Sequence, residues 1–177
     1  LTKYINFTAW VDECNEFLGR NYSGEIMKPT PLRTIYDEMI KDAGLIMWSD
    51  VSADIVGNTF RLKVMRQEIP SLSINDDFFV SGSLASKKLP AKRVSQVNVF
   101  HGKKNPLEEQ DQKKNHTTIY TELTADPVVA LEGNTPSIRE IFSRWITVFN
   151  LPAAEDLAGR LLSRYEVAPR KISFKVP

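Results

Sequence analysis

The chain has 177 residues, of which 42% are hydrophobic, and its 23 basic and 22 acidic side chains give a net charge of +1. A nearly neutral chain has no overall field to attract nucleic acid or an anionic membrane, so binding to either would depend on a local patch of charge. The apolar content is enough for a core that needs neither disulfide bonds nor a structural metal. No apolar run approaches the roughly 20 residues of a membrane-spanning helix, so we expect no spanning segment.

The first predicted element is a helix over residues 8–19. Apolar side chains recur there at intervals of three and four residues, which is typical of one buried helical stripe. The stripe contains Phe7, Trp10, Val11, Cys14, Phe17 and Leu18. Cys14 is the only cysteine of the chain and has no internal disulfide partner, and its place on the stripe favours ordinary packing over a reactive thiol.

The second predicted helix has the clearest boundaries in the sequence. Thr30 is suited to the N-cap, Pro31 to the first helical position, and Gly44 to the left-handed residue that ends a helix. Its expected buried face consists of Leu32, Ile35, Tyr36, Met39, Ile40 and Ala43. A buried strand over residues 45–48 and a returning strand over residues 59–66 are expected to follow as a β-hairpin.

Two strands are predicted in the middle of the chain, over residues 93–101 and 116–124, because both segments are rich in β-branched and aromatic residues. The connection between them has the sequence GKKNPLEEQDQKKN, which is polar and rich in turn-forming residues. We expect this excursion, residues 102–115, to project from the protein as a mobile segment.

The end of the chain contains one ambiguous segment and two clear ones. Residues 137–146 have helical periodicity and a capping box of Ser137 and Glu140, yet part of the segment also alternates as a strand would. A compact amphipathic helix is predicted over residues 151–165. The last strand, over residues 171–176, is predicted to bury one side and to need a neighbour for its open edge.

These elements predict an α+β fold with two closely packed sub-modules. Residues 1–70 are expected to form a helix-plus-β-hairpin half. Residues 71–177 are expected to form a strand-rich half closed by the C-terminal helix and strand. Because the chain begins with Leu1 and ends in an open strand, we expect it to be a fragment of a longer protein.

Few residues offer metal-binding chemistry. His101 and His116 flank the excursion, but no third histidine, cysteine or carboxylate pair stands at a metal-ligand spacing beside them. The segment DVSAD, residues 50–54, has the alternating oxygens of a calcium loop but lacks the glycine and the final glutamate that such a loop requires. We therefore expect no metal site.

Candidates for catalysis are equally few. Asp76 and Asp77 could supply an acid, but the same residues are typical of a turn. The sequence has no glycine-rich phosphate loop, dinucleotide fingerprint or serine elbow. We expect a protein that is not an enzyme, with no catalytic or cofactor-binding residues.

Pairs of basic residues are the one feature that suggests nucleic acid, because cations spaced along loops can neutralise phosphates. The doublets are Lys87-Lys88, Lys92-Arg93, Lys103-Lys104 and Lys113-Lys114. No aromatic platform stands beside them, and acidic residues share the excursion with the last two doublets. A solvated loop is the preferred interpretation, and we expect no salt-sensitive DNA binding of micromolar strength.

Six segments, taken in chain order, carry a resemblance to a known family. They are PTPLRTIYDEMIKDAGLIMWSD, NTFRLKVMR, INDDFFVSGSLASKK, AKRVSQVNVFHG, IREIFSRWI and LAGRLLSRYEVAPRKISFKVP. Together they resemble the hub proteins of phage tail tips and baseplates, whose relatives include the spike proteins of contractile injection machines. The resemblance covers most of the chain without a catalytic signature, and it implies a strand within residues 137–146.

The resemblance implies a structural role in a phage or prophage tail tip, with three copies around a central channel and synthesis in the bacterial cytoplasm. The implied partners are other tail-tip proteins and further copies of the chain, while DNA and the tape-measure protein pass through without being bound. No cofactor is implied. Two alternatives stay open: a nucleic-acid-binding module that uses the lysine doublets, and a wall or polysaccharide hydrolase with Asp76 or Asp77 as its acid.

Overall fold

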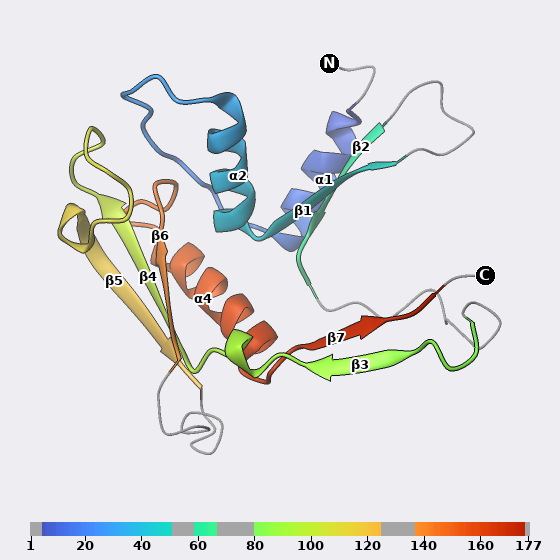
Figure 1. Ribbon diagram of the computed structural model, residues 1–177. Coiled ribbons are helices and arrows are strands. Elements are labelled where there is room, and N and C mark those ends of the chain that lie inside the picture. The colour runs from blue at the N-terminus through green and yellow to red at the C-terminus, as the bar shows by residue number, and fades with distance from the viewer. Residues whose placement is uncertain (1–4, 51–58, 67–79, 125–136, 176–177) are drawn as a thin grey trace.

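The computed structural model describes residues 5–50, 59–66, 80–124 and 137–175. Its elements form an α+β fold, which confirms the predicted fold class (Figure 1). The helices are α1 (Phe7–Phe17), α2 (Leu32–Ala43) and α4 (Leu151–Tyr165), with short 3-10 turns η2 (Pro90–Lys92) and η3 (Lys113–Asn115). The strands are β1 (Leu45–Asp50), β2 (Thr59–Val64), β3 (Ala85–Lys88), β4 (Gln96–Lys103), β5 (His116–Leu123), β6 (Ile138–Phe142) and β7 (Arg170–Ser173). In the described part of the chain they form the sheets β1-β2, β3-β7 and β5-β4-β6.

The core lies between the three-stranded sheet and helix α4. Strand β4 is central in this sheet, antiparallel to β5 and parallel to β6. Val97 and Val99 of β4 are fully buried and belong to one core cluster with Leu157 and Ala158 of α4. Each valine or leucine buried in this way contributes roughly 1.5 to 3 kcal/mol. The amphipathic helix predicted over residues 151–165 is therefore confirmed.

Residues 137–146 form a strand followed by a turn, so the helical periodicity is misleading. Every residue of β6 is paired in parallel with β4. Ser137, which the sequence suggests as a helix cap, instead donates its backbone N–H to Ser95 Oγ at 2.9 Å. Pairing with a distant strand outweighs a local helical preference, because it places Ile141 in the core.

Helix α1 forms where the sequence predicts it, but its apolar stripe is not a buried core. The Asn6 side chain caps the helix by accepting a hydrogen bond from the Ala9 N–H at 3.1 Å. All eleven residues of α1 are described, and none of them is buried. Phe7, Val11 and Phe17 are 47%, 54% and 41% exposed. The predicted burial of the stripe is wrong because α1 packs mainly against one narrow strand, β2.

Helix α2 begins one residue later than predicted and buries only part of its predicted face, with Ala43 buried and Ile35, Tyr36 and Ile40 partly buried. Pro31 is the N-cap, and the Thr30 hydroxyl donates to a backbone carbonyl two residues earlier instead of capping the helix. Gly44 ends the helix with a φ of 64°, as predicted. Leu32 and Met39 of the predicted buried face are exposed. The buried residues of the helix are Asp42 and Ala43.

The predicted hairpin is confirmed, since β1 and β2 pair antiparallel from Leu45 opposite Val64 onward. The prediction that β1 is a buried strand is wrong. Its side chains alternate between exposed and partly buried, and Ile46 and Trp48 are the exposed apolar ones.

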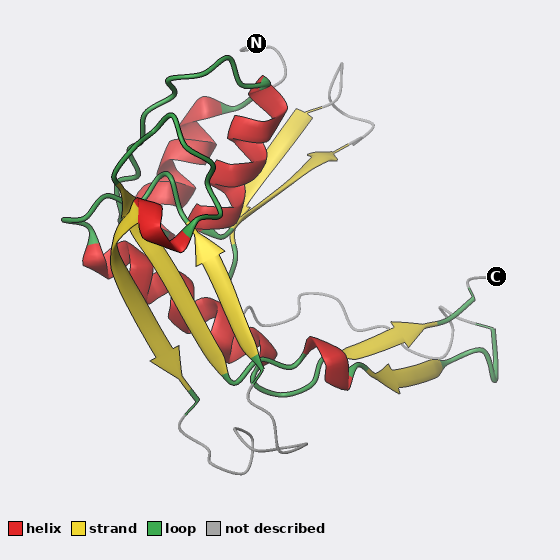
Figure 2. Cartoon of the chain, turned by 60° about the vertical axis from the view of Figure 1, so that its left-hand side comes forward, coloured by secondary structure: helices red, strands yellow, loops and turns green. Residues whose placement is uncertain are grey.

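The last strand finds its partner within the chain. β7 pairs antiparallel with β3, and all residues of both strands are exposed. The predicted buried side of this strand is therefore wrong, and Ile172 is 62% exposed. The two strands form a ribbon that projects away from α4 and the three-stranded sheet (Figure 2).

The excursion between β4 and β5 is tied to the protein, contrary to the expectation of a mobile segment. Lys104 N–H donates to the Asn115 carbonyl at 2.8 Å, and Asn105 N–H donates to the Asn115 side chain at 2.9 Å. Gln110 Nε2 donates to the Phe142 carbonyl of β6 at 2.8 Å. These bonds replace those that a solvated loop would make with water.

Polar contacts join residues 5–66, which we call the N-terminal half, to residues 80–175, the C-terminal half. Arg20 Nε lies 2.8 Å from Asp156 Oδ2 of α4, and Ser143 Oγ donates to Asp42 Oδ2 of α2 at 2.6 Å. The boundary predicted at residue 70 lies outside the described residues, so the division at that position stays a prediction.

Candidate functional site

Each of the two histidines is held by a backbone carbonyl. His101 is fully buried, with its Nδ1 3.0 Å from the carbonyl oxygen of Thr147, and His116 Nδ1 lies 3.1 Å from that of Gln112. Burial lowers the pKa of His116 and so favours its neutral form. Among the described residues, no group of three histidine, cysteine, aspartate or glutamate side chains could hold a metal ion. The histidines therefore anchor turns at the ends of their strands.

The other candidates for chemistry are held in structural contacts or lie outside the described residues. Asp50 Oδ2 pairs with Arg61 Nε across the hairpin at 3.1 Å. Burial raises the pKa of the half-buried Cys14 thiol, which disfavours the reactive thiolate. The rest of the calcium-like segment, and Asp76 and Asp77, lie outside the described residues. The hydrolase alternative therefore stays a prediction.

The basic doublets fall in different environments. Lys87 and Lys88 lie on the exposed strand β3. Arg93 is 5% exposed and so cannot reach a phosphate in solvent. Lys113 Nζ lies 2.5 Å from Glu140 Oε1 of β6, so this lysine is paired within the protein. The doublet of residues 103–104 lines a cavity.

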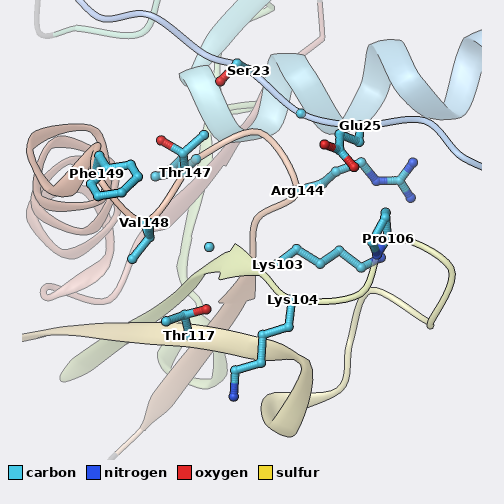
Figure 3. Close-up of a pocket in the computed structure, with 13 residues that line it drawn as sticks. Ser23, Glu25, Lys103, Lys104, Pro106, Thr117, Arg144, Thr147, Val148 and Phe149 are labelled. Carbon is cyan, nitrogen blue, oxygen red and sulfur yellow. The ribbon is translucent and has the colours of Figure 1, made fainter.

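This cavity has a volume of about 380 Å³ and lies between residues 23–25, the excursion and the turn after β6 (Figure 3). Lys103 and Arg144 extend toward the end of the cavity where Glu25 lies. Gly24 allows residues 23–25 to approach the turn after β6 closely. A Cβ atom on Gly24 would lie only 2.8 Å from the Arg144 carbonyl oxygen, which is too close for any larger residue.

Lys103 and Arg144, two of the cations of the cavity, are bonded within the protein. Burial lowers the pKa of Lys103, and the Arg144 guanidinium lowers it further. Lys103 Nζ donates to the Glu108 carbonyl at 2.8 Å, while Arg144 Nε lies 3.3 Å from Glu38 Oε2 of α2. These contacts connect the excursion, the turn and α2, so the cavity is a structural junction between the two halves.

A second feature is the apolar face of the β1-β2 sheet that presents Ile46 and Trp48. These two side chains point to the same side of β1, and each is 45% exposed. Arg61 and Lys63 stand opposite them on β2. The other side of the sheet is better covered, and Val64 there is 3% exposed. We call the first side the Trp48 face.

A third feature is one that the sequence interpretation missed. Lys87 and Lys88 of β3 lie opposite Lys171 and Arg170 of β7, so the ribbon carries four cations side by side. No local pattern pairs these two strands. The available signal was that the sequences of both segments lack acidic residues.

No helix in the described part of the chain is long and apolar enough to cross a membrane. Comparison with protein-family models, with curated proteins and with solved structures finds no match for this chain.

Proposed function

We propose that this chain is a structural component of a phage or prophage tail tip, a hub-like protein that takes part in tail assembly and in delivery of DNA into the host. The proposal of a hub-like protein rests on the six segments of the sequence that, in chain order, resemble tail-tip hubs. The observation that carries the proposal is the Trp48 face, because a hub part must hold its neighbours through exposed apolar surface.

The Trp48 face has the character of a protein contact. A two-stranded sheet is marginally stable in water, and it gains stability when a neighbour covers its open side. Trp48 can supply a large buried area with little loss of side-chain freedom, and tryptophan and arginine are the residues that most often dominate binding energy at interfaces. Arg61, held by Asp50, stands directly opposite Trp48. Ile46 and Trp48 thus form a small apolar centre, and Arg61 is its charged neighbour.

The partners that we propose are other tail-tip proteins and further copies of the chain, arranged as a homotrimer in the particle. DNA and the tape-measure protein pass through the channel of that trimer. The proposed location is the virion tail tip, after synthesis in the bacterial cytoplasm. A closed ring of three copies repeats one head-to-tail contact, in which the Trp48 face of each copy packs on a second, different surface of the next copy.

Immunoelectron microscopy of purified particles tests the proposal. An antibody raised against this chain should label one end of the tail, at the tip. The double variant Ile46→Ser/Trp48→Ser should reduce incorporation into particles by about tenfold or more, because it removes the apolar centre of the contact. The control Leu107→Ser/Val167→Ser changes two side chains that are 52% and 68% exposed elsewhere, and it should leave incorporation unchanged. Antigen found only outside particles would contradict the proposal.

A further inference from the structure

The ribbon of β3 and β7 is longer than its paired residues alone suggest. Antiparallel pairing from Ala85 opposite Ser173 to Lys88 opposite Arg170 forms its centre. The Leu89 N–H donates to the Pro169 carbonyl at 2.8 Å at one end. At the other end the Val80 N–H donates to the Lys175 carbonyl at 2.9 Å. Among the described residues, the result is a narrow arm that projects from the body of the protein, formed by α4 and the three-stranded sheet (Figures 1 and 2).

This arm is strongly basic on both of its faces. Lys87 and Lys171 share one face, and Lys88 and Arg170 share the other, because directly opposed residues of an antiparallel pair point to the same side. Lys175 adds a further cation toward one end, and Lys92 follows the other. The sequence has no aspartate or glutamate in residues 80–93 or 167–177. Since the whole chain has a net charge of only +1, the rest of the molecule is acidic overall.

The four central cations have no charge partner within the described structure. None of the ion pairs between described residues involves Lys87, Lys88, Arg170 or Lys171. Like charges placed directly opposite each other destabilise an antiparallel pair, and a two-stranded ribbon is already marginal by itself. An anionic partner would remove this repulsion and stabilise the arm when it binds.

Lysines on an edge strand also have a simpler role, which is to prevent pairing with the edge of another sheet. One or two charges are enough for that purpose. Two opposed cationic pairs, flanked by two more lysines and free of acidic residues in sequence, instead give the arm positive charge on both of its faces. An arm of this kind matches a regular array of negative charge.

We propose that the β3-β7 ribbon binds the phosphate backbone of nucleic acid. Phosphates are evenly spaced along both strands of a duplex, so a narrow arm with cations on two faces can contact them from either side, and a two-stranded ribbon is narrow enough to enter the major groove. The acidic side chains of the protein are less suited as partners. In the excursion, for example, Glu108, Glu109 and Asp111 lie between two lysine doublets. The inference revises the sequence-based expectation of no DNA binding and does not depend on the proposed location in a tail.

Fluorescence anisotropy with a short labelled DNA duplex tests the inference on the purified chain. We expect a dissociation constant on the order of micromolar at about 50 mM salt. Affinity should fall about 100-fold by about 200 mM salt if four cations each displace one counterion. The variant Lys87→Gln/Lys88→Gln/Arg170→Gln/Lys171→Gln should lose this binding. Its circular dichroism spectrum and melting should show that the body, which the ribbon does not bury, is still folded.

A matched control separates the ribbon from charge in general. The variant Lys28→Gln/Arg33→Gln/Lys41→Gln/Lys114→Gln removes the same number of cations from exposed positions outside the ribbon, and it should keep DNA binding within about twofold. The inference is overturned if the parent chain does not bind DNA, or if both variants lose affinity equally. It is also overturned if the ribbon cations support only self-association or binding to vesicles of anionic lipid. If the parent chain does not bind DNA and the variant that lacks the four ribbon cations aggregates, the role of these cations is to prevent pairing with the edge of another sheet.

Discussion

At the scale of single residues, Asp42 is a carboxylate that the fold places in an unfavourable position. It is 3% exposed and lies in the last turn of α2, where the helix dipole disfavours negative charge. Burial raises its pKa from 3.8 to about 6, although the hydrogen bond from Ser143 Oγ opposes the shift. Lys41 and Glu38 are the charged groups that act on it, in opposite directions.

The raised pKa predicts how Asp42 changes stability with pH. Between pH 3.8 and about 6 the folded state holds a proton that the unfolded state has lost, so the contribution of Asp42 to stability falls as the pH rises through this window. Above it, the ionised carboxylate lowers the free energy of unfolding by at most about 3 kcal/mol. Asp42→Asn, which keeps an oxygen to accept from Ser143, should therefore be more stable than the parent at pH 8 and nearly equal to it at pH 3.5.

Urea unfolding at both pH values measures this difference. Asp37→Asn is the control, because Asp37 lies on the exposed side of the same helix, where its carboxylate is 66% exposed and pairs with Arg33 at 3.7 Å. The control should shift stability little and equally at the two pH values. A loss of stability in Asp42→Asn at pH 8 would show that the ionised carboxylate helps to hold the fold.

The candidate sites show what could be predicted from residue types alone. The lysine doublets are visible in the sequence, and so is the lack of metal-ligand spacing around His101. Which doublet is exposed depends on contacts with distant parts of the chain. Arg93 is buried and Lys113 is paired with Glu140, while Lys87 is left beside other cations. Such differences follow from tertiary packing, so a single sequence does not reveal them.

At the scale of elements, the local signals at the end of α2 and along α4 were reliable, while those over β6 were not. The end of α2 at Gly44 and the apolar face of α4 depend on residues a few positions apart, and both were predicted. Strand β6 has the period of a helix, yet it pairs with β4, which lies far away in the sequence. The burial of α1 and β1 was overestimated, because periodicity shows which side of an element is apolar but not whether another element covers it.

The exposure of the ribbon predicts that the body folds without it. Removal of residues 170–177 eliminates β7, and β3 loses its partner, but no described residue of either strand is buried. We expect the melting temperature, followed by circular dichroism, to fall by no more than about 5 °C, because a marginal ribbon contributes on the order of 1 kcal/mol.

A longer truncation is the control for this prediction. Removal of residues 162–177 also deletes Leu162, which is 6% exposed and belongs to the core cluster, and Tyr165, which packs against that cluster. This variant should lose its cooperative melting transition, because burial of large side chains at the end of α4 is removed. Equal damage by the two truncations would mean that the ribbon supports the body.

At the scale of the whole molecule, polar contacts join the two halves, and Tyr22 of the N-terminal half packs against the core cluster of the C-terminal half. Arg144 is central among them: its Nε lies 3.3 Å from Glu38 Oε2 and 3.3 Å from Gln110 Oε1, and its side chain is 16% exposed. It thus links α2 of the N-terminal half to the turn after β6 and to the excursion. Breaking a partly buried pair of this kind costs more than breaking an exposed one, because removal of one partner leaves the other charge with little access to water.

The junction predicts that the halves unfold together. In the variant Trp10→Phe/Trp48→Phe, Trp145 is the remaining one of three tryptophans and reports on the C-terminal half, while far-ultraviolet circular dichroism reports on all helices. Both signals should give the same urea midpoint.

Arg144→Ala in this background should lower both midpoints together, by about 2 kcal/mol in stability, because Glu38 loses its partner. Arg33→Ala, which removes a pair whose side chains are 92% and 66% exposed, should change neither. Two separate midpoints in Trp10→Phe/Trp48→Phe, without the Arg144 change, would show that the halves are independent domains. The cavity between them would then be a contact surface rather than a structural junction.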